Sequence, residues 1–136
     1  MHNDQFEIIK TKDGTNTVYS KSFHATYHSA HGALQESNHV FIKNGLLAID
    51  DKKNAINILE YGIGTFLNTA LTFSNGKEKI INYTGLEKFP LPYSIIQNLN
   101  YGGLIPIIEK LYNLDWNKEH VLSKNFKFKK LQVDFL

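Results

Sequence analysis

The stretch of sequence that decides the fold is "ILEYGIGTFLNTALTF", residues 58–73. It predicts an apolar strand, a glycine turn and an apolar helix, the order of elements in which nucleotide-type cofactor sites are usually built. Residues 79–89, "KIINYTGLEKF", predict a second buried strand, so these elements form a βαβ unit. Ligands of α/β sheets bind beyond the carboxyl ends of parallel strands, which places "EYGIG" (60–64) at the expected site.

Two further elements are indicated upstream of this unit. Residues 6–23, "FEIIKTKDGTNTVYSKSF", place Asp13-Gly14 between two alternating β-rich runs, which is a strong signal for a β-hairpin. Residues 32–45, "GALQESNHVFIKNG", carry apolar side chains at helical spacing, and Gly45 suits a position just past a helix end. We therefore expect an N-terminal hairpin followed by a helix.

Downstream, Pro90 and Pro92 interrupt the chain before two helical stretches at 93–99 and 104–114. Residues 126–134 supply a last strand. Strands that alternate with helices favour an α/β layer with a parallel sheet. We predict strands near 56–60, 80–86 and 126–134, with the first in the middle.

The composition of the chain narrows the classes of protein to which it can belong. The 136 residues suffice for one domain with a core, and a net charge of +2 gives no strong field toward nucleic acid or membrane. There is no cysteine, the N-terminus lacks the apolar core of a signal peptide, and no apolar run reaches the ~20 residues that span a bilayer. We expect a soluble, cytoplasmic protein without membrane contact.

The glycine turn limits the choice of cofactor. A dinucleotide fingerprint that begins at Gly62 needs a third glycine at 67, where this chain has leucine. The pattern of an acid and alternating glycines is met by Glu60, Gly62 and Gly64 and fails only at Phe66. This pattern suits S-adenosyl-L-methionine, which has no pyrophosphate and whose cationic methionine end is served by a carboxylate.

A second acid, Glu87, ends the next strand, where it can accept hydrogen bonds from both ribose hydroxyls. We expect Glu60 and Glu87 to bracket one nucleoside. The alternative is that Gly62 and Gly64 only make a tight turn and that both acids are solvated. A nicotinamide oxidoreductase rests on the α/β pattern alone.

Three segments, "YHSAHGALQESNHVFIKNGL" (27–46), "ILEYGIGTFLNTALTF" (58–73) and "YTGLEKFPLP" (83–92), resemble the methyltransferase family that completes 5-methylaminomethyl-2-thiouridine at the tRNA wobble position. The family includes forms fused to a flavin oxidase domain, and this chain resembles the standalone form. The resemblance implies a partial Rossmann-like class I methyltransferase fold with an N-terminal β-hairpin, as a single domain over 1–136. It implies transfer of a methyl group from S-adenosyl-L-methionine to the aminomethyl nitrogen, with tRNA as the partner.

The resemblance also assigns site residues by position. Cofactor contacts are implied for the glycine loop, the ribose acid, the acid that neighbours adenine, and an upstream wall: Glu60, Gly62, Gly64, Asn68, Glu87, Asp134 and Tyr27. Ser29 and Glu36 lie in the segment that walls the substrate pocket, and we expect His28 to line it too. No catalytic residue is assigned.

Two departures from the family pattern matter. Phe66 replaces the third glycine, where its ring would crowd the cofactor or force the loop aside. The family continues after the strand with Asp134 into a segment that faces the substrate amine, so residues 1–136 resemble an N-terminal portion. We therefore expect no methylation by this chain alone. The alternative function is a cofactor-binding or structural fragment that pairs with another chain, or with itself, through the unpaired apolar edge of "INILEY" (56–61).

Two other patterns have competing interpretations. His24, His28 and His31 are closely spaced, but no cysteine or nearby carboxylate pattern accompanies them, which disfavours zinc. "KNFKFKK" (124–130) mixes lysine and phenylalanine as RNA-contacting segments do, and the favoured alternative is a strand with solvated lysines and core phenylalanines. Tyr112 and Trp116 are expected in the core.

Overall fold

The computed structural model describes residues 5–28, 32–49, 55–76 and 78–134. The N-terminal part is a small antiparallel sheet in the order β1 (Phe6–Lys10), β2 (Asn16–Ser20) and β3 (Ala25–Thr26). β1 and β2 are joined through Asp13-Gly14, and Gly14 has φ +86°, a left-handed conformation that favours glycine. The predicted hairpin is confirmed.

The hairpin loop caps the following helix, α1 (Ala33–Ser37), which continues as a π-helix, η2 (Asn38–Lys43). Three backbone N–H groups at the start of α1 donate to loop side chains, to Thr11 Oγ1 at 3.1 Å, Thr15 Oγ1 at 3.2 Å and Asp13 Oδ2 at 3.0 Å. These groups have no partner inside a helix, so the loop satisfies them and fixes the hairpin on α1. The helix predicted over 32–45 is confirmed, with a short 3₁₀ turn, η3 (Leu46–Ala48), after Gly45.

The main sheet has four strands in the order β4-β5-β7-β6: β4 (Ala55–Tyr61), β5 (Ile80–Glu87), β6 (Glu119–Ser123) and β7 (Phe126–Gln132). β4, β5 and β7 pair in parallel, as predicted, and β6 is antiparallel to β7. The prediction that the first strand lies in the middle is wrong for the described residues. Ile81 of β5 pairs with Ile56 on one side and Phe126 on the other, because successive crossovers add β5 and then β7 on the same side of β4.

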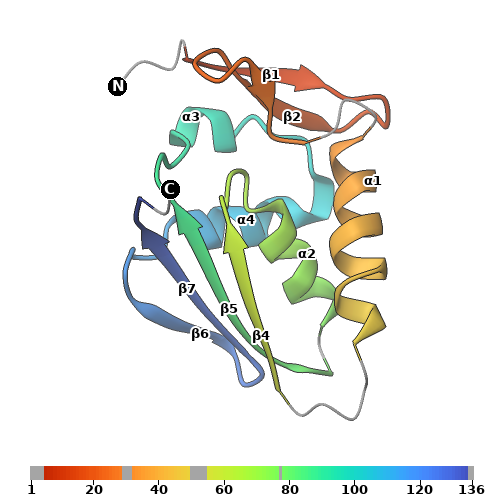
Figure 1. Ribbon diagram of the computed structural model, residues 1–136, viewed down its shortest axis with the longest axis vertical. Helices are drawn as coiled ribbons and strands as arrows, with labels where there is room; N and C mark the ends of the chain where they lie inside the picture. The colour runs from red at the N-terminus through yellow and green to blue at the C-terminus, as the bar shows by residue number, and fades with distance from the viewer. Residues whose placement is uncertain (1–4, 29–31, 50–54, 77, 135–136) are drawn as a thin grey trace.

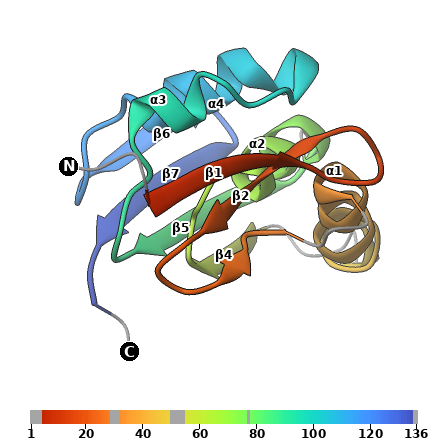
Figure 2. The same ribbon diagram turned by 90° about the horizontal axis from the view of Figure 1, so that it is seen from above.

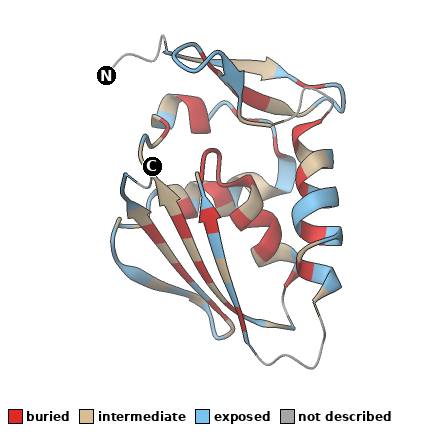
Figure 3. Ribbon diagram, viewed as in Figure 1, coloured by how far each residue is buried: buried red, intermediate tan, exposed pale blue. Residues whose placement is uncertain are grey.

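Four helical segments complete the fold: α2 (Leu67–Asn75), α3 (Tyr93–Ile96), η4 (Gly102–Leu104) and α4 (Ile105–Tyr112). α2 and α4 pack on one face of the main sheet, and α1 and η2 lie beside α2 (Figure 1). Side chains between these layers are buried, with Ile81, Ile108 and Phe128 all 0% exposed. Figure 3 shows this contrast between buried α2 and the largely exposed outer side of α1. The core therefore lies between one face of the sheet and its helices.

The hairpin sheet lies over the carboxyl ends of β4, β5 and β7, as Figures 1 and 2 both show. It is tied to the loop before η4, because Tyr101 donates its hydroxyl to the Asn16 carbonyl at 2.6 Å and Asn16 N donates to Asn100 Oδ1 at 2.6 Å. The glycine turn after β4 thus faces the underside of the hairpin sheet.

Candidate functional site

A cavity of about 770 Å³ lies between the hairpin sheet and the carboxyl ends of the parallel strands. Its volume falls within the ~300–1,000 Å³ typical of small-molecule sites. Three regions line it, the hairpin sheet with its turns, the glycine loop after β4 and the ends of β5 and β7: Gln5, Phe6, Ser20, Ser22, Phe23, Ala25, Thr26, Tyr27, Gly62, Gly64, Glu87, Lys88, Phe89, Pro90 and Gln132. The cavity therefore sits where α/β folds bind ligands.

The glycine loop gives the cavity a backbone wall. Gly62 has φ +80° and Gly64 has φ +58°, both left-handed, and nothing lies within 4 Å of a Cβ built on Gly62. A Cβ on Gly64 would come within 2.8 Å of Tyr27 Cδ2, so the tyrosine ring packs directly on this glycine. The N–H of Gly62 donates to the Leu86 carbonyl at 2.8 Å, which holds the loop against the end of β5.

Phe66 has a left-handed backbone conformation of the kind that favours glycine. Its φ is +66°, and this left-handed geometry costs a residue with a Cβ roughly 1–2 kcal/mol. The ring does not enter the cavity, because it is 3% exposed and packs edge-on against Tyr112 with ring centroids 6.2 Å apart. The predicted crowding of the cofactor by Phe66 is therefore wrong, since core packing holds the ring on the other side of the loop.

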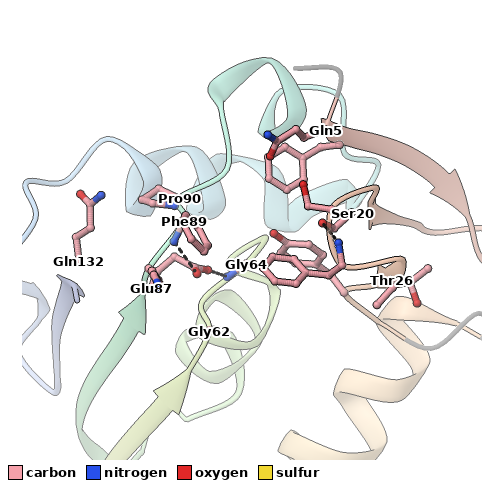
Figure 4. Close-up of a pocket in the computed structure, with 15 residues that line it drawn as sticks. Gln5, Ser20, Thr26, Gly62, Gly64, Glu87, Phe89, Pro90 and Gln132 are labelled. Carbon is pink, nitrogen blue, oxygen red and sulfur yellow. Dashed lines mark hydrogen bonds between the residues drawn. The ribbon is translucent and has the colours of Figure 1, made fainter. Parts of the chain in front are cut away.

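Glu87 joins the glycine loop to the next loop. Its Oε1 accepts from the Gly64 N–H at 2.9 Å and its Oε2 accepts from the Phe89 N–H at 3.3 Å (Figure 4). Burial, together with the charge of Glu87, raises the pKa of the Tyr27 hydroxyl to about 12. The cavity thus has a carboxylate in its wall, next to a tyrosine that stays protonated.

Glu60 is placed differently from the sequence prediction. Its carboxylate is buried, with Oε2 accepting from Asn68 Nδ2 at 2.8 Å and Oε1 accepting from the Tyr83 hydroxyl at 2.8 Å. Burial raises its pKa to about 7, and Glu87 adds to the rise, against the opposing effect of the two hydrogen bonds. Residues 56, 58 and 60 share the strand face that packs on the helices, so Glu60 and Asn68 lie beneath the loop rather than in the cavity wall.

The expectation that Glu60 and Glu87 bracket one nucleoside is therefore not met, because only Glu87 lines the cavity. The alternative of two solvated acids also fails, since Glu60 is 8% exposed and Glu87 is half-buried and hydrogen-bonded. Glu60 instead supports the loop from below through Asn68 in α2 and Tyr83 in β5.

The residues predicted upstream of the glycine loop also differ in whether they line the cavity. Tyr27 lines the cavity, and Ser29 lies outside the described residues. His28 bonds Thr17 Oγ1 through Nδ1 at 2.8 Å, and burial lowers its pKa while nearby Glu36 opposes that change. Neither His28 nor Glu36, which belongs to α1, is among the residues that line the cavity.

Asp134 follows the end of β7 and forms an ion pair with Lys88 at 2.9 Å. Its side chain is 57% exposed, and its partner Lys88 lines the cavity. Within the described ranges, no group of three or more histidine, aspartate or glutamate side chains could hold a metal ion, and His31 falls outside those ranges. None of the described helices is long and apolar enough to cross a membrane.

Lys130 is a buried cation that the sequence analysis missed. Phe126 and Phe128 of the same segment are in the core, as the favoured alternative predicted, but Lys130 is 0% exposed rather than solvated. Its Nζ donates to the Tyr112 carbonyl at 2.6 Å and lies 4.6 Å from the ring centroid of Trp116. Burial lowers its pKa to about 8.

The fold and the site define an α/β protein with a Rossmann-like parallel sheet and a small-molecule cavity at the carboxyl ends of its strands. The chain is similar to the tRNA 5-methylaminomethyl-2-thiouridine biosynthesis bifunctional protein MnmC of Burkholderia multivorans, with 32% identity over 80 residues that make up 54% of this chain and 12% of that protein. The protein of the same name from Burkholderia mallei is 34% identical over 89 residues, 61% of this chain and 13% of its own length. No family model matches the chain.

The fold also matches a solved structure, that of MNMC2 from Aquifex aeolicus. The TM-score is 0.76 and the sequence identity 25%, and the match covers 95% of this chain and 43% of that one. These comparisons confirm the fold class and the family resemblance that the sequence predicted. The matched region spans only 12–13% of the length of the curated relatives.

Proposed function

We propose that this chain forms the S-adenosyl-L-methionine site of a tRNA-modifying methyltransferase. The proposed reaction is methyl transfer to the aminomethyl nitrogen of the wobble uridine, which is the last step of 5-methylaminomethyl-2-thiouridine formation. We propose that it takes place in the cytoplasm. The names of the relatives support the pathway. The observation that carries the cofactor is Glu87 in the cavity wall, beside the glycine loop at the carboxyl end of β5.

The cavity residues fit an adenosine. Glu87 offers two carboxylate oxygens, which can accept charge-assisted hydrogen bonds from a pair of ribose hydroxyls. The open space beside Gly62 lets a ligand approach the backbone closely. The position where a dinucleotide fingerprint would have its third glycine is Leu67, which is 1% exposed in the core, so nothing there favours a pyrophosphate.

The bound cofactor would supply an electrophilic methyl group on a sulfonium. We propose binding and orienting roles for the described residues and the role of catalytic base for none of them. Acceleration of such a displacement comes mainly from holding a neutral amine in line, about 3 Å from the methyl. Phe6 and Tyr27 line the cavity with aromatic surface, which would exclude water from the bound nucleoside.

A second candidate function is a cofactor-binding or structural unit that works with another chain. Among the described residues, β4 is paired only with β5, and its side chains Leu59 and Tyr61 are 54% and 65% exposed. These side chains lie on the sheet face opposite the helices, and the backbone edge of β4 is a place where a further strand can add. Self-association through this edge is part of the same proposal.

Parallel calorimetric titrations with S-adenosyl-L-methionine and with NAD test the cofactor. We expect saturable binding of S-adenosyl-L-methionine and none of NAD, and the reverse result would contradict the proposed S-adenosyl-L-methionine site. Labelled S-adenosyl-L-methionine and tRNA that carries the aminomethyl wobble uridine then separate the two. Methyl incorporation above a control without protein supports a complete enzyme, whereas cofactor binding without incorporation supports the second candidate.

A further inference from the structure

Two exposed phenylalanine rings face each other at the mouth of the cavity. Phe23 comes from the turn after β2 and is 67% exposed, and Phe89 comes from the loop after β5 and is 50% exposed. Their ring centroids are 6.3 Å apart and the rings are tilted by 42°. Figure 4 shows Phe89 directly above Glu87, on the side of the cavity opposite Ser20 and Thr26 of the hairpin sheet.

Both rings are presented by anchored backbone rather than by core packing. The Phe23 N–H donates to Ser20 Oγ at 3.4 Å, and the next residue, His24, has φ +50° and reaches Tyr19 at 3.5 Å. The Phe89 N–H donates to Glu87 at 3.3 Å. A folded protein gains nothing from holding two large apolar rings in water, so an exposed pair at a cavity mouth indicates a ligand surface.

The geometry suits a flat aromatic ligand. A planar ring can stack on the exposed face of either phenylalanine, and it would stack on both only if one ring turned out of their 42° tilt. Unpaired nucleobases of RNA loops are recognised in this way, by stacking on phenylalanine, tyrosine or tryptophan. Lys21 is exposed in the same turn as Phe23, on the side where a phosphate backbone would pass. Lys88 Nζ lies 5.2 Å from the Phe89 ring centroid and is paired with Asp134 at 2.9 Å.

We propose that Phe23 and Phe89 form a stacking clamp for an unpaired nucleobase of the RNA substrate. This inference rests on the proposed function, which supplies tRNA as the substrate. Phe23 and Phe89 both line the cavity that the cofactor would occupy, and Phe89 lies next to Glu87, so the clamp would stand at the exposed rim of the same cavity.

The test compares Phe23→Ala with Phe41→Ala, a matched control on η2 that is 45% exposed and is not among the residues lining the cavity. Binding of a fluorescently labelled anticodon stem-loop RNA is measured by anisotropy, and binding of S-adenosyl-L-methionine by calorimetry. Loss of one base stack is expected to weaken RNA binding by Phe23→Ala about tenfold or more. Because Phe23 lines the cavity, the affinity of each variant for S-adenosyl-L-methionine is measured in parallel, and the loss of RNA affinity is expected without the cofactor as well as with it. The control should match wild type in both assays.

Phe23→Leu and Phe23→Trp separate stacking from apolar contact. Phe23→Leu keeps apolar volume without a ring and should lose RNA affinity, whereas Phe23→Trp should keep it. Equal RNA binding by wild type and Phe23→Ala would overturn the clamp and leave the proposed function standing. Weakened S-adenosyl-L-methionine binding with unchanged RNA binding would assign the ring pair to the cofactor's adenine and overturn the RNA assignment. No RNA binding by wild type would overturn the clamp together with the tRNA part of the proposed function.

Discussion

Replacing Glu60 with glutamine tests how the buried carboxylate beneath the glycine loop is held. Burial raises the pKa of Glu60 from its ordinary value of 4.5 to about 7, so the folded state holds this proton more tightly than the unfolded chain does. The wild-type free energy of unfolding must therefore fall as pH rises from 4.5 through about 7. At 1.36 kcal/mol for each pKa unit, the loss is ~3 kcal/mol by pH 8.

Glutamine removes the titration and keeps the contacts. Its carbonyl can accept from the Tyr83 hydroxyl. Its amide can donate to Asn68 Oδ1 once the Asn68 amide turns over, because Nδ2 faces residue 60 and Oδ1 has no hydrogen-bond partner among the described residues. We expect Glu60→Gln to match wild type within about 1 kcal/mol at pH 5 and to exceed it by up to ~3 kcal/mol at pH 8. Urea unfolding at pH 5, 6.5 and 8 measures this, with exposed Glu119→Gln as the control. Parallel pH profiles for wild type and Glu60→Gln would refute the reasoning.

Three further substitutions test the surroundings of the site. Phe66→Gly relieves a left-handed backbone that costs ~1–2 kcal/mol but removes a buried ring worth ~3–5 kcal/mol. Urea unfolding should therefore show a net loss of ~1–4 kcal/mol, and an unchanged stability would place the ring outside the core. The pKa of Lys130 is lowered from 10.5 to about 8, so the free energy of unfolding of the wild type should rise by up to ~3 kcal/mol between pH 8 and 10.5. Lys130→Met should show no such rise. Identical pH dependence of stability in the two proteins would mean that Lys130 is hydrated. Asp13→Ala removes the acceptor for the Gln35 N–H. We expect the free energy of unfolding to fall by ~1–2 kcal/mol and hydrogen exchange at the start of α1 to become faster. Unchanged exchange there would show that the loop does not cap the helix.

The fold was predictable where its signals are local. Asp13-Gly14 marks a hairpin because the turn needs a left-handed residue, and the βαβ unit follows from apolar periodicity around the glycine loop. Strand order was not predictable in the same way, since it depends on pairing between residues far apart, such as Ile81 with both Ile56 and Phe126. β6 was missed because an edge strand with one open face has few buried side chains, as the alternation over Glu119–Ser123 shows.

The site was predictable in part for similar reasons. Glu87 stands at a strand end next to the glycine loop, and that position alone placed it in the cavity wall. The sequence did carry a signal against Glu60, because it shares strand parity with Ile56 and Ile58 and so points toward the helices. Lys130 alternates with Phe126 and Phe128 on the same face of β7, so the sequence could have predicted that it points into the core. Nothing local marks Phe23, whose role depends on a loop more than sixty residues away.

The central claim is that Glu87 binds the ribose of S-adenosyl-L-methionine in this cavity. Calorimetric titration of the cofactor into wild type, Glu87→Ala and Glu60→Gln tests it most directly. Each charge-assisted bond lost is worth ~1.5–3 kcal/mol before compensation by water, so Glu87→Ala should weaken binding about tenfold or more. Glu60→Gln should weaken it less, since Glu60 lies beneath the loop and outside the cavity wall. Equal affinities for wild type and Glu87→Ala would contradict the claim and remove Glu87 from the site.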